Sequence, residues 1–212
     1  MFIIMTINVE SWLVEAKPAV PSRRGRPDMA ATRRQQMVSA FLALIGERGL
    51  ASVSLDDVAA ASGVQRSVIR HYLGNRTQLV HEAAATLIDT YAGLIKTAIG
   101  EQPGAQQIIG YLFSREWGSA DDLDRAFDEL FHEAARDSTL RGRLHDAYAL
   151  LTDALAEAIR RDRPATPAAS AEQIAYQIVC LAEHNTTMQR LGFPAEQAAA
   201  AQALAHRLAT EG

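Results

Sequence analysis

Apolar side chains recur along most of the chain at the three- and four-residue spacing of one helical face. Between Thr32 and Arg48 this face carries Met37, Val38, Phe41, Leu44 and Ile45. Polar and glycine-containing breaks mark further helices at 55–62, 65–73, 77–99, 105–117, 121–136, 138–161, 170–190 and 195–209. No segment keeps up the apolar–polar alternation of a strand. The pattern predicts an all-α protein of about nine helices.

Residues 49–74 contain two short predicted helices joined by a tight turn. Ser54 precedes Asp57 by three positions, a variant of the capping box that predicts a helix starting directly after the serine. Ala59 is small enough to let the two helices approach closely, and Gly63 permits the positive φ that the turn requires. This spacing is typical of a helix-turn-helix.

The outer face of the second short helix carries side chains that contact bases and phosphates in protein–DNA complexes. They are Gln65, Arg66, Ser67, Arg70, His71 and Tyr72. Arginine suits guanine, glutamine suits adenine, and the other types suit phosphate or base edges. The alternative is an ordinary helical hairpin with a polar outer face, but the pattern favours DNA binding.

The net charge of −4 conceals an uneven distribution. Residues 21–80 hold nine arginines and four carboxylates, a balance of +5, whereas residues 81–212 have a balance of −8. A basic segment joined to an acidic body favours a polyanionic partner for the first part. Chance segregation of solvated charge is the alternative.

Residues 1–28 are proline-containing and are expected to be a flexible leader with a basic arm. Within it, Arg23, Arg24, Gly25, Arg26 and Pro27 resemble an AT-hook core, which lies extended in the minor groove of A·T-rich DNA. We expect this arm to raise affinity without setting much sequence preference. Residues 1–22 are either a native extension or the product of a misassigned start.

Several protein classes are disfavoured by composition. The single Cys180 argues against a disulfide framework and a cysteine-based zinc site. No apolar run approaches the ~18 residues of a membrane span, and the apolar opening MFIIMTINV lacks the basic flank of a signal peptide. These features predict a cytoplasmic protein.

The stretch from Arg33 to Val80 resembles the DNA-binding domain of the TetR (tetracycline-repressor) family, most closely in the segment GVQRSVIRHYLGNRTQL. The resemblance implies a three-helix DNA-binding domain at 29–76, followed by a larger helical ligand-sensing and dimerisation domain at 77–212. Val53, Arg70 and Leu73 depart from the residues frequent in the family, so no operator sequence can be carried over.

The resemblance also implies a role for each residue of the DNA-binding segment. Gln65, Arg66, Ser67, Arg70 and His71 would face the major groove, and Ser54, Tyr72 and Arg76 would contact phosphates. Arg33 and Arg34 would clamp the flanking backbone, with plain solvation as the alternative. The implied function is a transcriptional regulator, expected to be a repressor released from a palindromic operator by a small-molecule inducer, with no cofactor.

For the carboxy-terminal region the resemblance implies an inducer cavity and a homodimer. Aromatic and histidine candidates for the cavity are Trp117, Phe127, Phe131, Tyr148 and His184, with ordinary core packing as the alternative. Dimerisation is expected through the helices near 170–190 and 195–209, and an inducer is expected to move the helix at 77–99.

Enzymatic motifs are incomplete. A di-iron bundle needs two ExxH motifs, whereas Glu129 and His132 supply one. A metal-binding protein or enzyme using Asp128, His132, His145 and His184 is the alternative function. The sequence predicts neither a catalytic residue nor a metal site, and not an enzyme.

Overall fold

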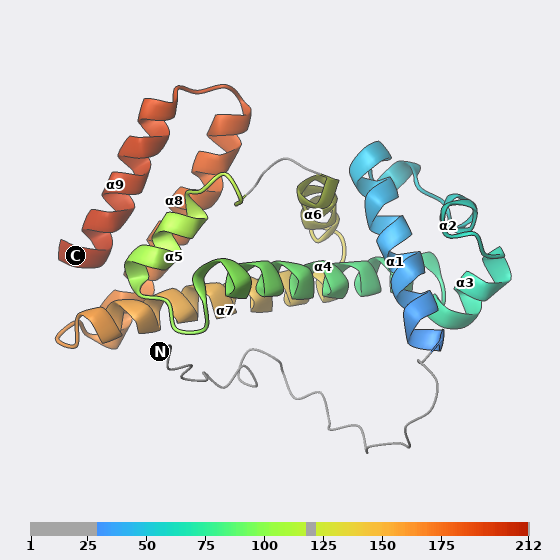
Figure 1. Cartoon of the computed structure of the whole chain (residues 1–212), viewed down its shortest axis with the longest axis horizontal. Helices are drawn as coiled ribbons and strands as arrows, with labels where there is room; N and C mark the ends of the chain where they lie inside the picture. The colour runs from blue at the N-terminus through green and yellow to red at the C-terminus, as the bar shows by residue number, and fades with distance from the viewer. Residues whose placement is uncertain (1–28, 118–121, 212) are drawn as a thin grey trace, which may run out of the picture. The chain divides into compact units, whose positions relative to one another are not determined.

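The computed structural model describes residues 29–117 and 122–211, which form helices and short connections. They belong to two compact units, and Figure 1 labels their helices. Within the described ranges, the first unit holds residues 29–91 and 122–145, and the second holds residues 92–117 and 146–211.

The first unit contains the amino-terminal helices together with one helix from later in the chain. Its elements are α1 (Met29–Arg48), the 3-10 turn η2 (Leu50–Ser52), α2 (Leu55–Ser62), α3 (Arg66–Leu73), most of α4 (Arg76–Ile99), α6 (Asp122–Glu133) and the start of α7 (Ser138–Asp162). Phe41 and Ile45 of α1, Ile69 of α3 and Leu130 of α6 are almost fully buried in one core. Burying each such side chain contributes about 1.5–3 kcal/mol, so α3 is held firmly by its apolar face.

Helices α1 and α6 approach each other closely at Gly46. A Cβ atom at this position would collide with the backbone carbonyl of Asp122. Arg125 of α6 donates from Nε to the carbonyl oxygen of Gly46 over 2.9 Å. The absence of a side chain at Gly46 therefore permits the contact between α1 and α6.

The second unit contains α5 (Ala105–Leu112), the rest of α7, α8 (Ala168–Arg190) and α9 (Ala195–Glu211). Helices α8 and α9 are antiparallel neighbours (Figure 1). Small side chains pack at the centre, since Ala175 of α8 and Ala205 of α9 are fully buried. The Asp162 carboxylate at the end of α7 accepts the Ala105 N–H over 2.9 Å and so supports the start of α5.

The all-α prediction is confirmed, and the nine α-helices among the described residues agree with the expected number. The helix expected at 105–117 is wrong at its end, because α5 stops at Leu112. There the Ser114 N–H donates to the Tyr111 carbonyl, and this three-residue spacing is that of a 3-10 turn, which ends the α-helix. None of the described helices has an apolar stretch of the length that a bilayer crossing needs.

The compact units divide the chain differently from the functional boundary expected at residue 76. The unit that contains the two short helices also takes in α4 up to Tyr91 and the whole of α6. The division by function into 29–76 and 77–212 stays a prediction.

Candidate nucleic-acid interface

Helix α2 begins at a capping box, as its sequence predicts. The Ser54 Oγ accepts the Asp57 N–H over 3.2 Å, and an Asp57 carboxylate oxygen accepts the Ser54 N–H over 2.8 Å. Hydrogen bonds from the Ser54 side chain and backbone hold the pKa of Asp57 below its ordinary value. Gly63 ends α2 with φ 68° and ψ 26°, the left-handed conformation expected for the turn.

Helix α3 follows this turn and has two sharply different faces. Ile69 and Leu73 are buried in the core of the first unit, and Val68 packs against it. The opposite face is exposed and polar. It carries Gln65, at the amino-terminal cap, and Arg66, Ser67, Arg70 and His71. Tyr72 is half-buried and meets the His71 ring edge-on at a centroid distance of 5.0 Å.

Two arginines that are predicted to contact the DNA backbone donate hydrogen bonds to carbonyl groups of the protein within the first unit. Arg34 of α1 donates from Nη2 to the Tyr72 carbonyl over 2.6 Å and pairs through Nη1 with Glu82 at 3.0 Å. Arg76, the first residue of α4, donates to the Leu50 carbonyl over 2.6 Å. The Arg34 guanidinium therefore joins α1 to α3 and α4, and the Arg76 guanidinium joins α4 to η2.

The other basic candidates differ in how far the structure describes them. Arg33 is exposed on the first turns of α1. Arg23, Arg24 and Arg26 lie outside the described residues.

Helix α6 binds the connection between α1 and α2, a contact that sequence reasoning missed. The Glu129 carboxylate accepts the Leu50 N–H over 2.7 Å, while Arg76 donates to the carbonyl of the same residue. Arg125 bonds Gly46 one turn earlier on α6. The four-residue spacing of Arg125 and Glu129 places both on one face of α6, and this spacing is the only signal in the sequence.

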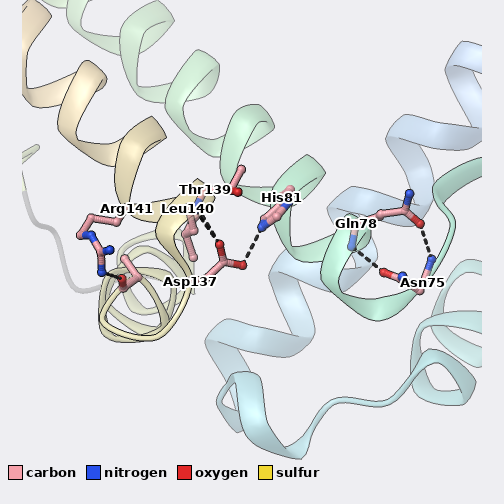
Figure 2. Close-up of polar contacts among 8 residues, drawn as sticks. Asn75, Gln78, His81, Asp137, Thr139, Leu140 and Arg141 are labelled. Carbon is pink, nitrogen blue, oxygen red and sulfur yellow. Dashed lines mark hydrogen bonds and ion pairs between the residues drawn. The ribbon is translucent and has the colours of Figure 1, made fainter.

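Helix α4 is capped and then linked to α7 (Figure 2). Asn75 and Gln78 bond each other's backbone N–H groups through their side chains, both at 2.9 Å. One turn further, His81 Nε2 lies 2.6 Å from Asp137 Oδ2. Backbone hydrogen bonds, chiefly from Leu140, and the bond to His81 lower the pKa of Asp137. The carboxylate therefore supports the start of α7 and fastens α4 to it.

The inducer-site candidates fall into both units. Phe127 packs against the core of the first unit and meets Tyr91 edge-on at 5.5 Å, whereas Phe131 is 53 % exposed. Trp117 and Tyr148 pack against the core of the second unit. His184 of α8 is exposed. Their role as ligand contacts stays a prediction.

The residues of the alternative metal site are not assembled as a ligand cluster. His132 Nδ1 lies 2.6 Å from the Asp128 carbonyl oxygen of its own helix. His145 is exposed on α7. Across residues 29–117 and 122–211, no group of three or more His, Cys, Asp or Glu side chains could hold a metal ion.

Comparison with known proteins gives a family for this helix-turn-helix. Residues 38–83 match the model described as bacterial regulatory proteins, tetR family. The helix-turn-helix segment is therefore similar to that of the tetR family. This match confirms the resemblance found in the sequence. Two curated relatives that the chain matches are both described as transcriptional regulators.

One curated relative is the HTH-type transcriptional regulator BetI of Agrobacterium fabrum, which is 33% identical over 75 residues. That alignment covers 33% of this chain and 36% of the relative. The chain spans between about a third and just over half the length of the curated relatives that it matches.

Solved structures support the fold over nearly the whole described chain. A TetR-family regulator from Cytophaga hutchinsonii has a TM-score of 0.72 at 15% identity, with 87% of this chain and 96% of that one covered. A transcriptional regulator from Saccharomonospora viridis, solved in complex with choline, has a TM-score of 0.70 at 14% identity, with coverages of 86% and 97%. The TetR fold therefore extends through the carboxy-terminal helices.

Proposed function

We propose that this chain is a transcriptional repressor that binds a palindromic operator as a homodimer and releases it when a small molecule binds. The observation that carries the proposal is the exposed polar face of α3, directly opposite buried Ile69 and Leu73. A rigid helix with arginine and glutamine on its outer face has the size and chemistry to enter a major groove.

The outer face of α3 is proposed to contact bases, and residues around it are proposed to contact phosphates. Gln65 and Arg66 lie at its amino-terminal end, and they are proposed to contact base edges, because a recognition helix makes most of its specific contacts there. Arg70 adds a second guanidinium one turn along the helix. Ser54, Tyr72 and Arg76 are proposed to position the helix through phosphates, as Arg33 and Arg34 are at the start of α1.

The leader is proposed to add minor-groove contacts through Arg23, Arg24 and Arg26. Each phosphate neutralised by a basic side chain steepens the dependence of DNA affinity on salt. Deleting residues 1–27 should therefore flatten this dependence. An unchanged salt dependence would show that the arm is idle.

Dimerisation is proposed through α8 and α9, which expose apolar side chains in the second unit. Tyr176 of α8 is 65 % exposed, and Leu191 and Phe193, in the connection to α9, are 69 % and 47 % exposed. Large apolar side chains that are left exposed are candidates for contact with another protein surface. A twofold dimer would present two α3 helices to successive major grooves, ~34–36 Å apart.

The inducer is proposed to bind among the carboxy-terminal helices and to shift α4, which begins next to α3 and continues into the second unit. Its effect on the operator can be only as large as its preference between two conformations. Choline is the first compound to test, because the fold neighbour from Saccharomonospora viridis was solved with it. Because the proposed partner is DNA, we also propose that the protein is cytoplasmic.

An electrophoretic shift with DNA flanking the protein's own gene tests the proposal. The wild type should shift this DNA at salt concentrations where unrelated DNA stays free. Arg70→Ala should weaken the shift, whereas Arg161→Ala, an equal charge change at an exposed position of α7, should not. Equal binding of flanking and unrelated DNA by the wild type would overturn the proposal.

A further inference from the structure

The recognition helix is tied to the preceding helix by one ion pair on its exposed surface. Arg66 Nη1 lies 2.9 Å from Asp56 Oδ2, a hydrogen-bonding distance. Arg66 is the first residue of α3, and Asp56 belongs to the first turn of α2. More than half of each side chain is exposed, 52 % for Arg66 and 66 % for Asp56.

Folding stability does not explain this pair, because exposed ion pairs contribute little to it. Helix α2 already has its own cap in Ser54 and Asp57, and α3 is held by buried Ile69. What the pair does fix is the direction of a flexible side chain. Arginine otherwise loses considerable conformational entropy when it is ordered on a base edge.

The geometry of the bond leaves the arginine able to read a base. A guanidinium group has five N–H donors, and a bidentate guanine contact uses two of them. Asp56 engages Nη1, so the edge formed by Nε and Nη2 stays available for the O6 and N7 atoms of guanine. Within the described part of the chain, the structure gives this guanidinium no other hydrogen-bond partner.

We infer that Asp56 is a positioning residue for DNA specificity, which holds Arg66 so that it reads one guanine in each half-site. This inference rests on the proposed function. The Asp56 carboxylate also repels phosphates, so it weakens binding to all sequences unless Arg66 engages a guanine. Together the two effects widen the difference between operator and unrelated DNA.

The test measures binding of the full chain to duplexes that carry the operator selected by the wild type, with one base pair changed at a time. Asp56→Asn should reduce discrimination at one guanine of each half-site by roughly tenfold, within the range set by one bidentate contact. The same variant should bind unrelated DNA more tightly. Arg66→Lys should lose discrimination at the same base pair, because an ammonium group keeps the charge but lacks the planar fork.

Three comparisons separate positioning from a general charge effect. Glu47→Gln removes another exposed carboxylate paired with an arginine, at the end of α1, and should change affinity without changing base preference. Asp56→Glu should restore discrimination, because it keeps a carboxylate within reach of Arg66. In an Arg66→Lys background, Asp56→Asn should cause no further loss.

The inference is overturned if Asp56→Asn keeps the wild-type base preference while far-UV circular dichroism shows it folded. It is equally overturned if the lost preference falls at a base pair that Arg66→Lys leaves unaffected. A wild type that prefers no sequence would instead refute the proposed function, and the inference with it.

Discussion

Replacing Glu129 by alanine tests how α6 holds the DNA-binding helices. The Leu50 peptide unit is bound on both sides, its N–H by the Glu129 carboxylate at 2.7 Å and its carbonyl by Arg76 at 2.6 Å. Removal of the carboxylate takes away a hydrogen bond to a charged group. It also leaves the Leu50 N–H, which lies beside the buried Leu50 side chain, without its carboxylate acceptor.

Hydrogen bonds to charged groups contribute about 1.5–3 kcal/mol, and an unsatisfied N–H costs about 1–3 kcal/mol. Because the Leu50 N–H is only part-buried, water can replace the carboxylate in part, and we expect a loss of about 1–3 kcal/mol. For a chain of this length that corresponds to a decrease in Tm of roughly 2–12 °C. Glu129→Gln keeps a neutral acceptor and should lose about half as much.

Urea unfolding followed by far-UV circular dichroism measures this loss, and operator binding is measured on the same samples. The matched control is Glu133→Ala, which removes the same side chain one turn later on α6. A Glu129→Ala variant that unfolds at the same urea concentration as Glu133→Ala would show that the Glu129 carboxylate does not stabilise the fold. The expected contribution of the hydrogen bond is also refuted if Glu129→Gln is no more stable than Glu129→Ala.

Three further predictions concern packing, protonation and assembly. Gly46→Ala should lower the free energy of unfolding by about 1–3 kcal/mol, because the new Cβ atom meets the backbone of α6. The control Gly142→Ala adds a Cβ atom in open space on α7 and should raise the free energy of unfolding by about 0.5–1 kcal/mol. Equal effects of the two variants would contradict the close packing at Gly46. His81→Ala should raise the pKa of Asp137, whose ionised form it helps to stabilise. A carboxylate whose pKa is lowered by folding stabilises the protein above its ordinary pKa, and this stability is lost as the pH falls through the pKa of the folded state. The variant should therefore lose this stability at a higher pH than the wild type. An NMR titration that finds an unchanged Asp137 pKa would refute the prediction. Phe193→Glu should shift sedimentation from dimer to monomer. It should also weaken operator binding at least tenfold, because the lost free energy is roughly that of burying one aromatic side chain. A variant that stays dimeric would show that this surface is not the dimer interface.

Local features of the fold could be predicted from the sequence because their causes lie within a few residues. The box formed by Ser54 and Asp57 and the left-handed turn at Gly63 involve only neighbouring residues, and both are present. The same holds for the buried face of α3, where the spacing of Ile69 and Leu73 fixes which side chains remain outside.

Contacts between distant segments could not be predicted in this way. Glu129 and Leu50 are 79 residues apart, and nothing near either residue indicates their hydrogen bond. The family resemblance assigns Arg34 and Arg76 to the DNA backbone, but it does not reveal their hydrogen bonds to backbone carbonyls of the protein. The pair formed by Asp56 and Arg66 likewise depends on how α2 and α3 pack, which one sequence alone does not specify.

Selection of bound duplexes from random DNA tests the central claim most directly, because it examines DNA binding, sequence preference and twofold symmetry together. We expect an enriched palindrome whose half-site centres lie about one helical turn, or ~34–36 Å, apart. We also expect Arg70→Ala to relax the preference at one base pair of each half-site. A pool with no enriched sequence, or with a single site that lacks a symmetric partner, would contradict the central claim.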